Sequence, residues 1–326
     1  MNIAIIGAGL IGKKRALNLP SGINLKYVCD VDTDKGKIFA EEFKCEYISS
    51  WKDIVSDSSI DAVFIATTHN ALAEIAVAAI KKGKHIFVEK PGARNSKEFN
   101  KVIDTYRRNP CVVVMFGYNH RYHPGIRKAK ELVDTKKYGK VMFIRARYGH
   151  GGRLGYEKEW RFNKAISGGG ELMDQGPHLI DLVNYFTGEM ETVIGFMPTL
   201  YWKTKLEDTA FFMMKNNKNQ FAHLSVSCVE WKNIFSFEIM LEKAKIQIDG
   251  LGRSYGKEKV TLYTMKPEMG PPDVKEFNFP DEDVSWKREN EIFFQRIKNK
   301  NYSPTAIYEA EYVLKIIDTI YKSFNR

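Results

Sequence analysis

The chain has 326 residues, of which 44% are hydrophobic and 28% are charged. This balance is typical of a folded protein of about two domains, and it excludes disordered and fibrous classes. Lysine and arginine (50) outnumber aspartate and glutamate (40), giving a net charge of +10. The basic residues are scattered, so we expect a solvated basic surface and no nucleic-acid partner.

The cysteines indicate a reducing compartment. Cys29, Cys45, Cys111 and Cys228 are far apart and form no C-x-x-C pair, which predicts neither a disulfide framework nor a zinc ribbon. The chain opens directly on an apolar run without a leader pattern, and no run approaches the roughly 20 residues of a membrane helix. We therefore predict a soluble, cytoplasmic protein with no membrane partner.

Residues 1–120 alternate short apolar runs with helical patterns, as in a parallel sheet covered on both faces. The predicted strands are 2–6, 25–29, 62–66, 85–88 and 112–116, and the predicted helices are 13–19, 35–43, 72–82 and 96–109. This order predicts a doubly wound α/β domain that binds a nucleotide.

Residues 121–326 change to long stretches of period-two alternation. The predicted strands are 141–148, 192–197, 209–214, 221–229, 236–241, 245–249 and 260–265. Successive strands separated by turn residues predict an α+β domain with a mostly antiparallel sheet. A proline-rich, acidic connection over 267–283 leads into two predicted helices, 286–298 and 306–324.

A G-x-G-x-x-G run, residues 7–12, follows the first predicted strand and opens a helix. Gly7 allows the tight turn, Gly9 lets the backbone approach a pyrophosphate, and Gly12 lets helix and strand pack closely. The helix N-terminus then supplies N–H donors for the phosphates. Asp30 ends the second strand, where its carboxylate can accept the ribose hydroxyls and repel a 2′-phosphate. The motif therefore favours NAD over NADP, although Asp32 is close enough to share this role.

Two further segments carry candidate chemistry. Glu89-Lys90-Pro91 ends the fourth predicted strand, at the carboxyl edge of the sheet where ligands bind in this architecture. Asp174 and His178 follow a triple glycine and are four residues apart, so they share a face if the segment is helical. Pro177 must either start that helix or kink it.

Together these motifs and the segment 117–124 (GYNHRYHP) resemble the glucose–fructose oxidoreductase/inositol dehydrogenase/rhizopine-catabolism (Gfo/Idh/MocA) family, in matching order over nearly the whole chain. The resemblance implies a Rossmann domain at 1–120 and a substrate-binding and oligomerisation domain at 121–326. That second domain has an open sheet, and the C-terminal helix packs back on the first domain. A homodimer or homotetramer formed through the sheet is also implied.

The resemblance also implies site residues. Lys90, Asp174 and His178 fall on the family's catalytic lysine, aspartate and histidine, and the Lys90–Pro91 bond is expected to be cis. The predicted dinucleotide contacts are Gly7, Gly9, Leu10, Ile11, Gly12, Asp30, Thr67, His69, Glu89 and Lys90. The predicted substrate contacts are Lys90, Asn119, Tyr148, Trp160, Arg161, Asp174 and His178.

The chain departs from the family pattern after the third predicted strand. The family commonly reads Thr-Pro-Asn-x-x-His there, whereas His69 stands at the asparagine position and Leu72 at the histidine position. The contacts to the nicotinamide ribose are therefore open. His120 and His123 have an H-x-x-H spacing, but no partner in the sequence completes a metal site, so no metal is expected.

The predicted function is NAD-dependent hydride transfer at a secondary alcohol or ketone of a sugar, cyclitol or sugar nucleotide. His178 is the candidate base, since an imidazole titrates near neutral pH. Lys90 would stabilise the developing alkoxide, and Asp174 would hold His178 or a substrate hydroxyl. Two alternatives are an NAD-dependent glycosidase on the same scaffold and a non-catalytic dinucleotide- or sugar-sensing regulator.

Overall fold

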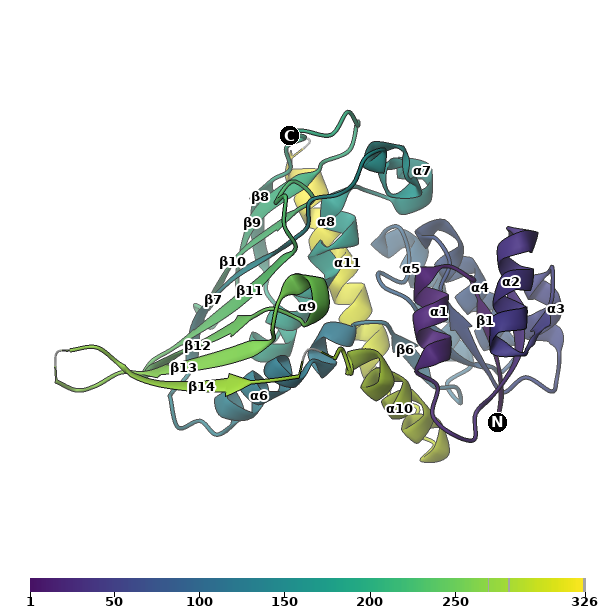
Figure 1. The fold of residues 1–326 in the computed structure, drawn as a ribbon, viewed down its shortest axis with the longest axis horizontal. Helices are drawn as coiled ribbons and strands as arrows, with labels where there is room; N and C mark the ends of the chain where they lie inside the picture. The colour runs from purple at the N-terminus through teal and green to yellow at the C-terminus, as the bar shows by residue number, and fades with distance from the viewer. Residues whose placement is uncertain (269, 281, 325–326) are drawn as a thin grey trace. The chain divides into compact units, whose positions relative to one another are not determined.

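The computed structural model describes residues 1–268, 270–280 and 282–324. They form two compact units (Figure 1). Unit 1 comprises Met1–Tyr118, Ala165–Gly168 and Trp286–Leu314, and unit 2 comprises Asn119–Lys164, Gly169–Ser285 and the chain from Lys315 onward. Each unit is built on one β-sheet.

Unit 1 contains a six-stranded sheet in the order β3-β2-β1-β4-β5-β6, and its strand pairs are all parallel. The strands are β1 (Asn2–Ile6), β2 (Asn24–Cys29), β3 (Glu46–Tyr47), β4 (Ala62–Ile65), β5 (His85–Val88) and β6 (Val114–Phe116). The helices α1 (Leu10–Leu17), α2 (Thr33–Phe43), α3 (Trp51–Ser56), α4 (His69–Lys81), α5 (Ser96–Arg108), α7 (Lys164–Ser167), α10 (Ser285–Lys298) and α11 (Thr305–Phe324) lie wholly or partly in unit 1. This strand order is that of the doubly wound Rossmann fold, which confirms the predicted class.

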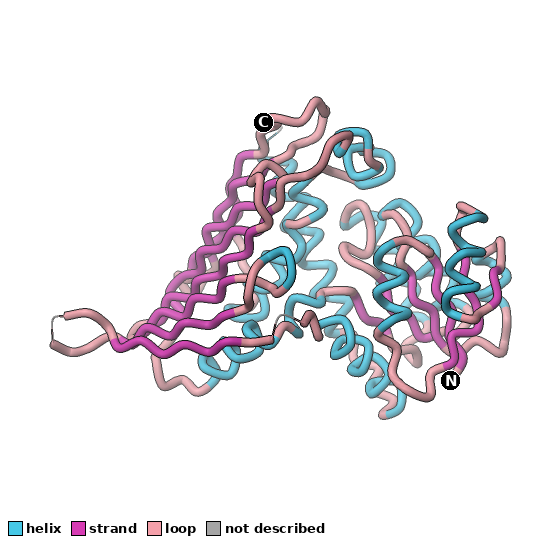
Figure 2. Tube along the Cα trace, in the orientation of Figure 1, coloured by secondary structure: helices cyan, strands magenta, loops and turns pink. Residues whose placement is uncertain are grey.

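The middle of the unit 1 sheet is buried on both faces. Strand β4 is apolar and buried throughout, and so is β1 after its first residue, Asn2, as expected when helices cover both sides of a parallel sheet. Figure 2 shows helices on either side of these strands. The glycine run follows β1, so the carboxyl edge of the sheet receives the predicted nucleotide motif.

Helix α10 supplies part of the core of unit 1, although it lies far along the chain. Phe293 meets Phe64 and Phe87 edge to face, with ring centroids 5.3 and 5.6 Å apart. Phe294 and Ile297 belong to the same buried cluster. The first unit is therefore assembled from separate stretches of sequence.

Unit 2 contains an eight-stranded sheet in the order β14-β13-β12-β11-β7-β10-β9-β8. The strands are β7 (Val141–Gly149), β8 (Thr192–Phe196), β9 (Thr209–Lys215), β10 (Phe221–Ser227), β11 (Ile234–Leu241), β12 (Ala244–Asp249), β13 (Lys259–Thr264) and β14 (Asp273–Asn278). Only the β7–β10 pair is parallel among the pairs formed by the described residues. The prediction of a mostly antiparallel sheet is confirmed, and Figure 2 shows its strands as one layer.

Helices cover one face of this sheet. The helical segments of unit 2 are η1 (Asn119–Tyr122), α6 (Pro124–Asp134), η2 (Tyr156–Lys158), η3 (Trp160–Phe162), α8 (Glu171–Asp174), α9 (Gly176–Thr187) and η4 (Arg253–Tyr255). Helix α9 packs on β7 and β10, and α6 packs on β12 and β13. The other face carries exposed large apolar side chains, among them Phe143, Phe211 and Met213.

Two sequence expectations are refined by the structure. The connection predicted over 267–283 was wrong in part, because β14 lies within it. Nearly every residue of β14 is exposed, so no buried alternation marks the strand in the sequence. Helix α9 begins at Gly176 with Pro177 in its first turn, so the proline starts the helix, where its missing N–H costs nothing.

Candidate active site

The glycine turn of unit 1 has no room for a side chain at Gly7 and Gly12 but has free space at Gly9. Gly7 has φ +109°, and a Cβ there would lie 2.4 Å from the Ala66 carbonyl oxygen. A Cβ on Gly12 would lie 1.9 Å from the Gly7 carbonyl oxygen, whereas a Cβ on Gly9 would meet nothing within 4 Å. Gly7 and Gly12 are therefore required by packing, and the free space at Gly9 fits a bound pyrophosphate.

The helix that follows the turn begins at Leu10, with Gly9 as its N-cap and no side chain capping it. Leu10 and Ile11 form its first turn, so their backbone N–H groups point out of the helix end. Donors of this kind suit a phosphate, because they carry part of the positive end of the helix dipole.

The Asp30 carboxylate is fixed beside the glycine turn. It accepts the Ala8 N–H at 2.7 Å and the Asp32 N–H at 2.8 Å. Asp32 is used differently, since it caps α2 by accepting the Lys35 N–H at 3.2 Å and pairs with the Lys35 ammonium at 2.7 Å. This favours Asp30 over Asp32 as the group that would meet the adenosine ribose.

We expect Asp30→Ser to weaken NAD binding by roughly 10- to 100-fold, the cost of losing hydrogen bonds to a charged acceptor. The affinity for NADP should change little, so the difference in affinity between NAD and NADP should become smaller. Titration calorimetry with both cofactors measures this. Asp34→Ser is the matched control, since Asp34 lies exposed in the first turn of α2, four residues beyond Asp30. A tenfold or greater preference of the wild type for NADP would refute the role of Asp30.

The other predicted cofactor residues of unit 1 lie after β4 and β5. The Thr67 hydroxyl donates to the Thr68 carbonyl at 3.1 Å, and His69 Nδ1 lies 2.8 Å from the Ser167 carbonyl oxygen. His69 is buried. Its partner Ser167 is 98 residues away in the chain, so no pattern in the sequence indicated this contact. The Lys90–Pro91 bond is cis, as the family resemblance implied. Lys90 itself is half-buried.

Glu89 belongs to a buried ionic cluster. Arg15, on α1, is fully buried and donates from Nε to Glu89 at 2.7 Å. Its Nη2 lies 2.7 Å from Glu289 of α10, and its guanidinium also stacks over the Phe87 and Trp286 rings. Burial lowers the pKa of Arg15, but the attraction of Glu89 and Glu289 outweighs that effect and raises it. Arg15 therefore stays charged and holds the residue next to Lys90.

Asp174, in unit 2, is buried and paired with an arginine. Arg161 Nε donates to Asp174 Oδ2 at 2.9 Å, and Arg161 Nη1 lies 3.1 Å from Glu159. Burial lowers the pKa of Arg161, yet Asp174 and its other neighbours raise it overall. Trp160 lies beside this pair, with the Arg161 guanidinium 4.8 Å from its ring centroid. The structure thus joins two predicted substrate residues, Arg161 and Asp174.

The triple glycine before Asp174 is required by close packing. A Cβ on Gly169 would lie 1.9 Å from the Tyr321 hydroxyl, and one on Gly170 would lie 2.1 Å from the Glu207 carbonyl oxygen. The buried Glu207 carboxylate accepts the Gly170 N–H at 2.9 Å and the Tyr321 hydroxyl at 2.6 Å. Burial raises the pKa of Glu207. These contacts fix the start of α8, the helix that ends at Asp174.

His178 lies in a buried cluster of rings. Its ring stacks on His120, with centroids 3.9 Å apart and an angle of 23° between the planes. Tyr148 meets both rings edge to face. Burial raises the pKa of Tyr148 well above its ordinary value, so its phenol stays protonated. Asn119 is also buried, and its amide donates to the Ser285 hydroxyl at 2.9 Å.

Sequence reasoning did not identify several of these contacts. Arg121 forms a double hydrogen bond with Asp181, one turn beyond His178, with Nε to Oδ2 at 2.7 Å and Nη2 to Oδ1 at 2.6 Å. Neither this pair nor the stacking of His120 on His178 joins residues at a short sequence spacing from which it could be predicted. Arg15 is the exception, because helical periodicity could have placed this charged residue on the side of α1 that faces the sheet. A charge on that side indicates a buried ionic contact.

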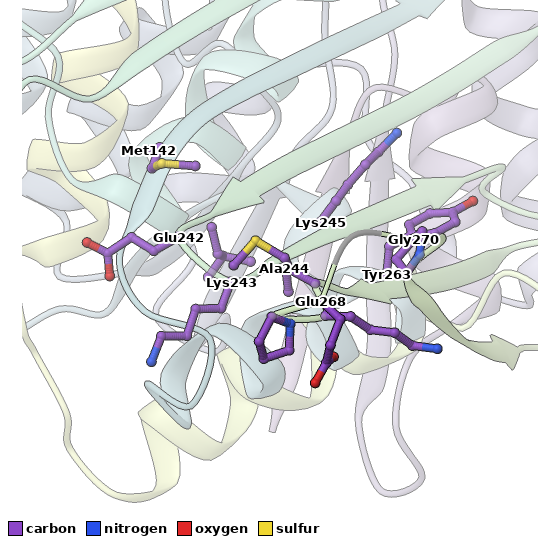
Figure 3. A pocket seen from close by; sticks show the side chains of 13 residues that line it. Met142, Glu242, Lys243, Ala244, Lys245, Tyr263, Glu268 and Gly270 are labelled. Atoms are coloured by element: carbon purple, nitrogen blue, oxygen red, sulfur yellow. The ribbon is translucent and has the colours of Figure 1, made fainter.

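A pocket of about 880 Å³ in unit 2 lies apart from these residues (Figure 3). It is lined by the turn between β11 and β12, the adjoining ends of β12 and β13, and the chain before β14, including Lys243, Lys245 and Tyr263. None of the predicted catalytic or substrate residues lines it. No group of three or more His, Cys, Asp and Glu side chains within 1–268, 270–280 and 282–324 is arranged to hold a metal ion.

A parallel Rossmann sheet with an open glycine turn and an anchored Asp30 defines a dinucleotide-binding protein. Residues 1–118 match the model of the oxidoreductase family with an NAD-binding Rossmann fold, and residues 126–247 match that of the GFO/IDH/MocA C-terminal domain. The chain belongs to this GFO/IDH/MocA family of oxidoreductases, which confirms the resemblance seen in the sequence.

Similar proteins include levoglucosan dehydrogenase of Pseudarthrobacter phenanthrenivorans, 31% identical over 212 residues that cover 61% of this chain and 54% of that one. Inositol 2-dehydrogenase of Salmonella paratyphi B is 27% identical over 45% of this chain and 46% of its own. The chain thus spans about half the length of the curated relatives it matches. A levoglucosan dehydrogenase structure with NADH and L-sorbose has a TM-score of 0.90 at 22% identity, covering 100% of this chain and 97% of that one, which shows the shared fold.

Among the described residues, the helices are all too short or too polar to cross a bilayer.

Proposed function

We propose that the protein transfers hydride between NAD and a secondary alcohol or ketone of a sugar-like substrate. Family membership supports the reaction class. The observation that carries the proposal is the glycine turn, with the open Gly9 and the Asp30 carboxylate bonded to the Ala8 N–H at 2.7 Å. Levoglucosan and inositol dehydrogenases among the relatives support a sugar or cyclitol as the substrate class.

The residues of unit 1 fit the cofactor. The N–H groups of Gly9–Gly12 would hold the pyrophosphate, and Asp30 would accept the adenosine-ribose hydroxyls. Thr67, His69 and Glu89 are proposed to line the nicotinamide end. When bound, the nicotinamide ring supplies an acceptor or donor of hydride.

Side chains of the protein would transfer the proton of the substrate hydroxyl and stabilise the negative charge of the alkoxide. His178 is the proposed base, taking the proton of the substrate hydroxyl during oxidation and returning it during reduction. Lys90 would stabilise the alkoxide oxygen as a fixed cation. Asp174, held by Arg161 at 2.9 Å, would accept a neighbouring substrate hydroxyl, with Tyr148, Trp160 and Asn119 around the sugar.

A sugar nucleotide or an acidic sugar is our proposed refinement of the substrate. The net charge of +10 supports an anionic ligand. We also propose a homodimer or homotetramer formed through the sheet of unit 2, supported by the exposed Phe143, Phe211 and Met213 on its open face. The free state of all four cysteines supports a cytoplasmic location.

The test is His178→Ala, assayed by NADH absorbance on a panel of polyols, sugars and sugar nucleotides. We expect kcat to fall by about 10²- to 10⁴-fold, the usual contribution of a general base, and the pH-rate limb near neutrality to disappear. NAD affinity should stay near that of the wild type. A histidine that only supports the fold would instead lower the melting temperature and preserve activity per folded molecule. Turnover by His178→Ala at the wild-type rate would leave Asp174 as the base.

A further inference from the structure

The two imidazoles in unit 2 are placed so that their charges must interact. His120 and His178 are each about 5% exposed, and their ring centroids are 3.9 Å apart. At that separation and burial, two positive rings repel strongly, because little water lies between them to screen the charge. Groups coupled this closely release their protons in two steps that belong to the pair.

A chain of hydrogen bonds fixes the orientation of the His120 ring. Ser285 Oγ donates to Asp283 at 2.5 Å, so it accepts from Asn119 Nδ2 at 2.9 Å. The Asn119 amide oxygen then faces His120 Nδ1 at 3.2 Å and accepts its N–H. His120 therefore carries a proton on Nδ1, and Nε2 is the nitrogen that gains or loses the second proton.

The phenols that face the stack keep their charge constant. Tyr148 lies 5.0 Å from His120 and 5.9 Å from His178 between ring centroids. Burial raises the pKa of Tyr148 well above its ordinary value and raises that of its neighbour Tyr255 to about 12. Both phenols remain neutral where an imidazole titrates.

Four charged groups on the surrounding elements lie against a counter-charge or a ring that can carry one. These pairs are Asp174 with Arg161, Asp181 with Arg121, Glu258 with His123, and Glu171 with His150. His123 also lies 3.7 Å from Asp283, and its ring centroid is 5.7 Å from that of His120. His123 and His150 thus lie near carboxylates, and the His120 ring stacks on that of His178.

We propose that His120 is a positioning residue for His178, and that the stacked pair takes up one proton in the pH range where the enzyme works. This inference rests on the proposed role of His178 as the base. A proton on His120 Nε2 would prevent His178 from accepting the substrate's proton. His120 would therefore set the pH at which oxidation begins.

The test is a pH titration of the full-length protein with ¹³C-labelled histidine, followed by NMR at the ring C2–H. In the wild type, the His178 signal should titrate in two steps separated by more than about 1 pH unit. In His120→Phe, which keeps a flat ring but removes the ionisable one, it should titrate in one step. The reciprocal variant, His178→Phe, should reduce His120 to one step. A wild-type His178 signal with one step that His120→Phe leaves unchanged would overturn the proposal.

Kinetics give a second readout. A pair with two places for one proton is half-protonated at a higher pH than a single ring. The acid limb of kcat/KM for oxidation should therefore move down by about 0.3 pH unit in His120→Phe, the statistical effect of losing one of two equivalent sites. His120→Gln should move the limb in the same direction, which covers the case in which Phe does not fit. His85→Asn is the control, because His85 packs on Tyr302 in unit 1, and its limb should stay at the wild-type pH.

The two proposals fail in distinguishable ways. If His178→Ala turns over substrate normally, the assignment of the base is wrong, and the role of His120 in activity falls with it. If His178→Ala is inactive but neither His120 variant moves the limb, the base stands and the positioning role of His120 is refuted.

Discussion

Lys90→Ala is expected to lower kcat by about 10²- to 10³-fold while leaving the Kd for NAD nearly unchanged. The reason is that an alkoxide exists only in or after the transition state, so a cation that stabilises it contributes little to cofactor binding. The measurements are steady-state kinetics on the true substrate, calorimetric NAD binding and the melting temperature.

Lys97→Ala is the matched control for this experiment. Lys97 is exposed on α5, a few residues along the chain from Lys90, so its loss should change neither kcat nor NAD binding. Lys90→Arg should keep part of the activity, because it retains the positive charge. The recovery should be incomplete, because the guanidinium group differs in shape from the ammonium group. A Lys90→Ala enzyme with normal kcat and weak NAD binding would show that Lys90 is a cofactor contact only.

Arg15→Ala should lower the free energy of unfolding by about 3–5 kcal/mol, the range found when one partner of a buried ion pair is removed. Arg15 is fully buried, and the change would leave Glu89 and Glu289 without the cation they share. Urea unfolding followed by fluorescence measures the loss. The same change should also lower kcat, because Glu89 adjoins Lys90.

The control is Arg107→Ala, since Arg107 forms a 3.6 Å ion pair with Asp104 on the surface of α5. Exposed pairs contribute little, so this variant should unfold near the wild-type midpoint. Arg15→Met combined with Glu289→Gln should recover part of the lost stability, because it removes a buried negative charge along with the positive one. Equal stabilities for Arg15→Ala and wild type would contradict the proposed importance of the ionic cluster.

The Rossmann unit was predictable because its strands are short apolar runs separated by turn residues. Strands β1 and β5 match the prediction residue for residue, while α1, α2 and α4 begin two or three residues earlier than predicted. The first turns of α2 and α4 carry few large apolar residues, and in α1 the apolar Leu10 is exposed, so the buried periodicity of these helices starts late. Strand β14 escaped prediction because its pairing with β13, rather than burial of its side chains, holds it in the sheet.

The candidate site was predictable only where its residues are close in sequence. The glycine turn and the Asp174–His178 spacing are local patterns. The Arg15–Glu89 pair and the His120–His178 stack join residues 74 and 58 positions apart, and no spacing rule relates such partners. The pairing of Asp174 with Arg161 likewise depends on how η3 and α8 pack.

The position of α10 in the core of unit 1 has a consequence for how the chain is made. During synthesis the strands that bear Phe64 and Phe87 emerge long before Phe293, whose ring packs against them. At about 5–20 residues per second, the ribosome needs roughly ten seconds or more to add the intervening 200 or so residues. Through that interval the nascent sheet carries an uncovered aromatic surface, which is the kind of surface that chaperones shield.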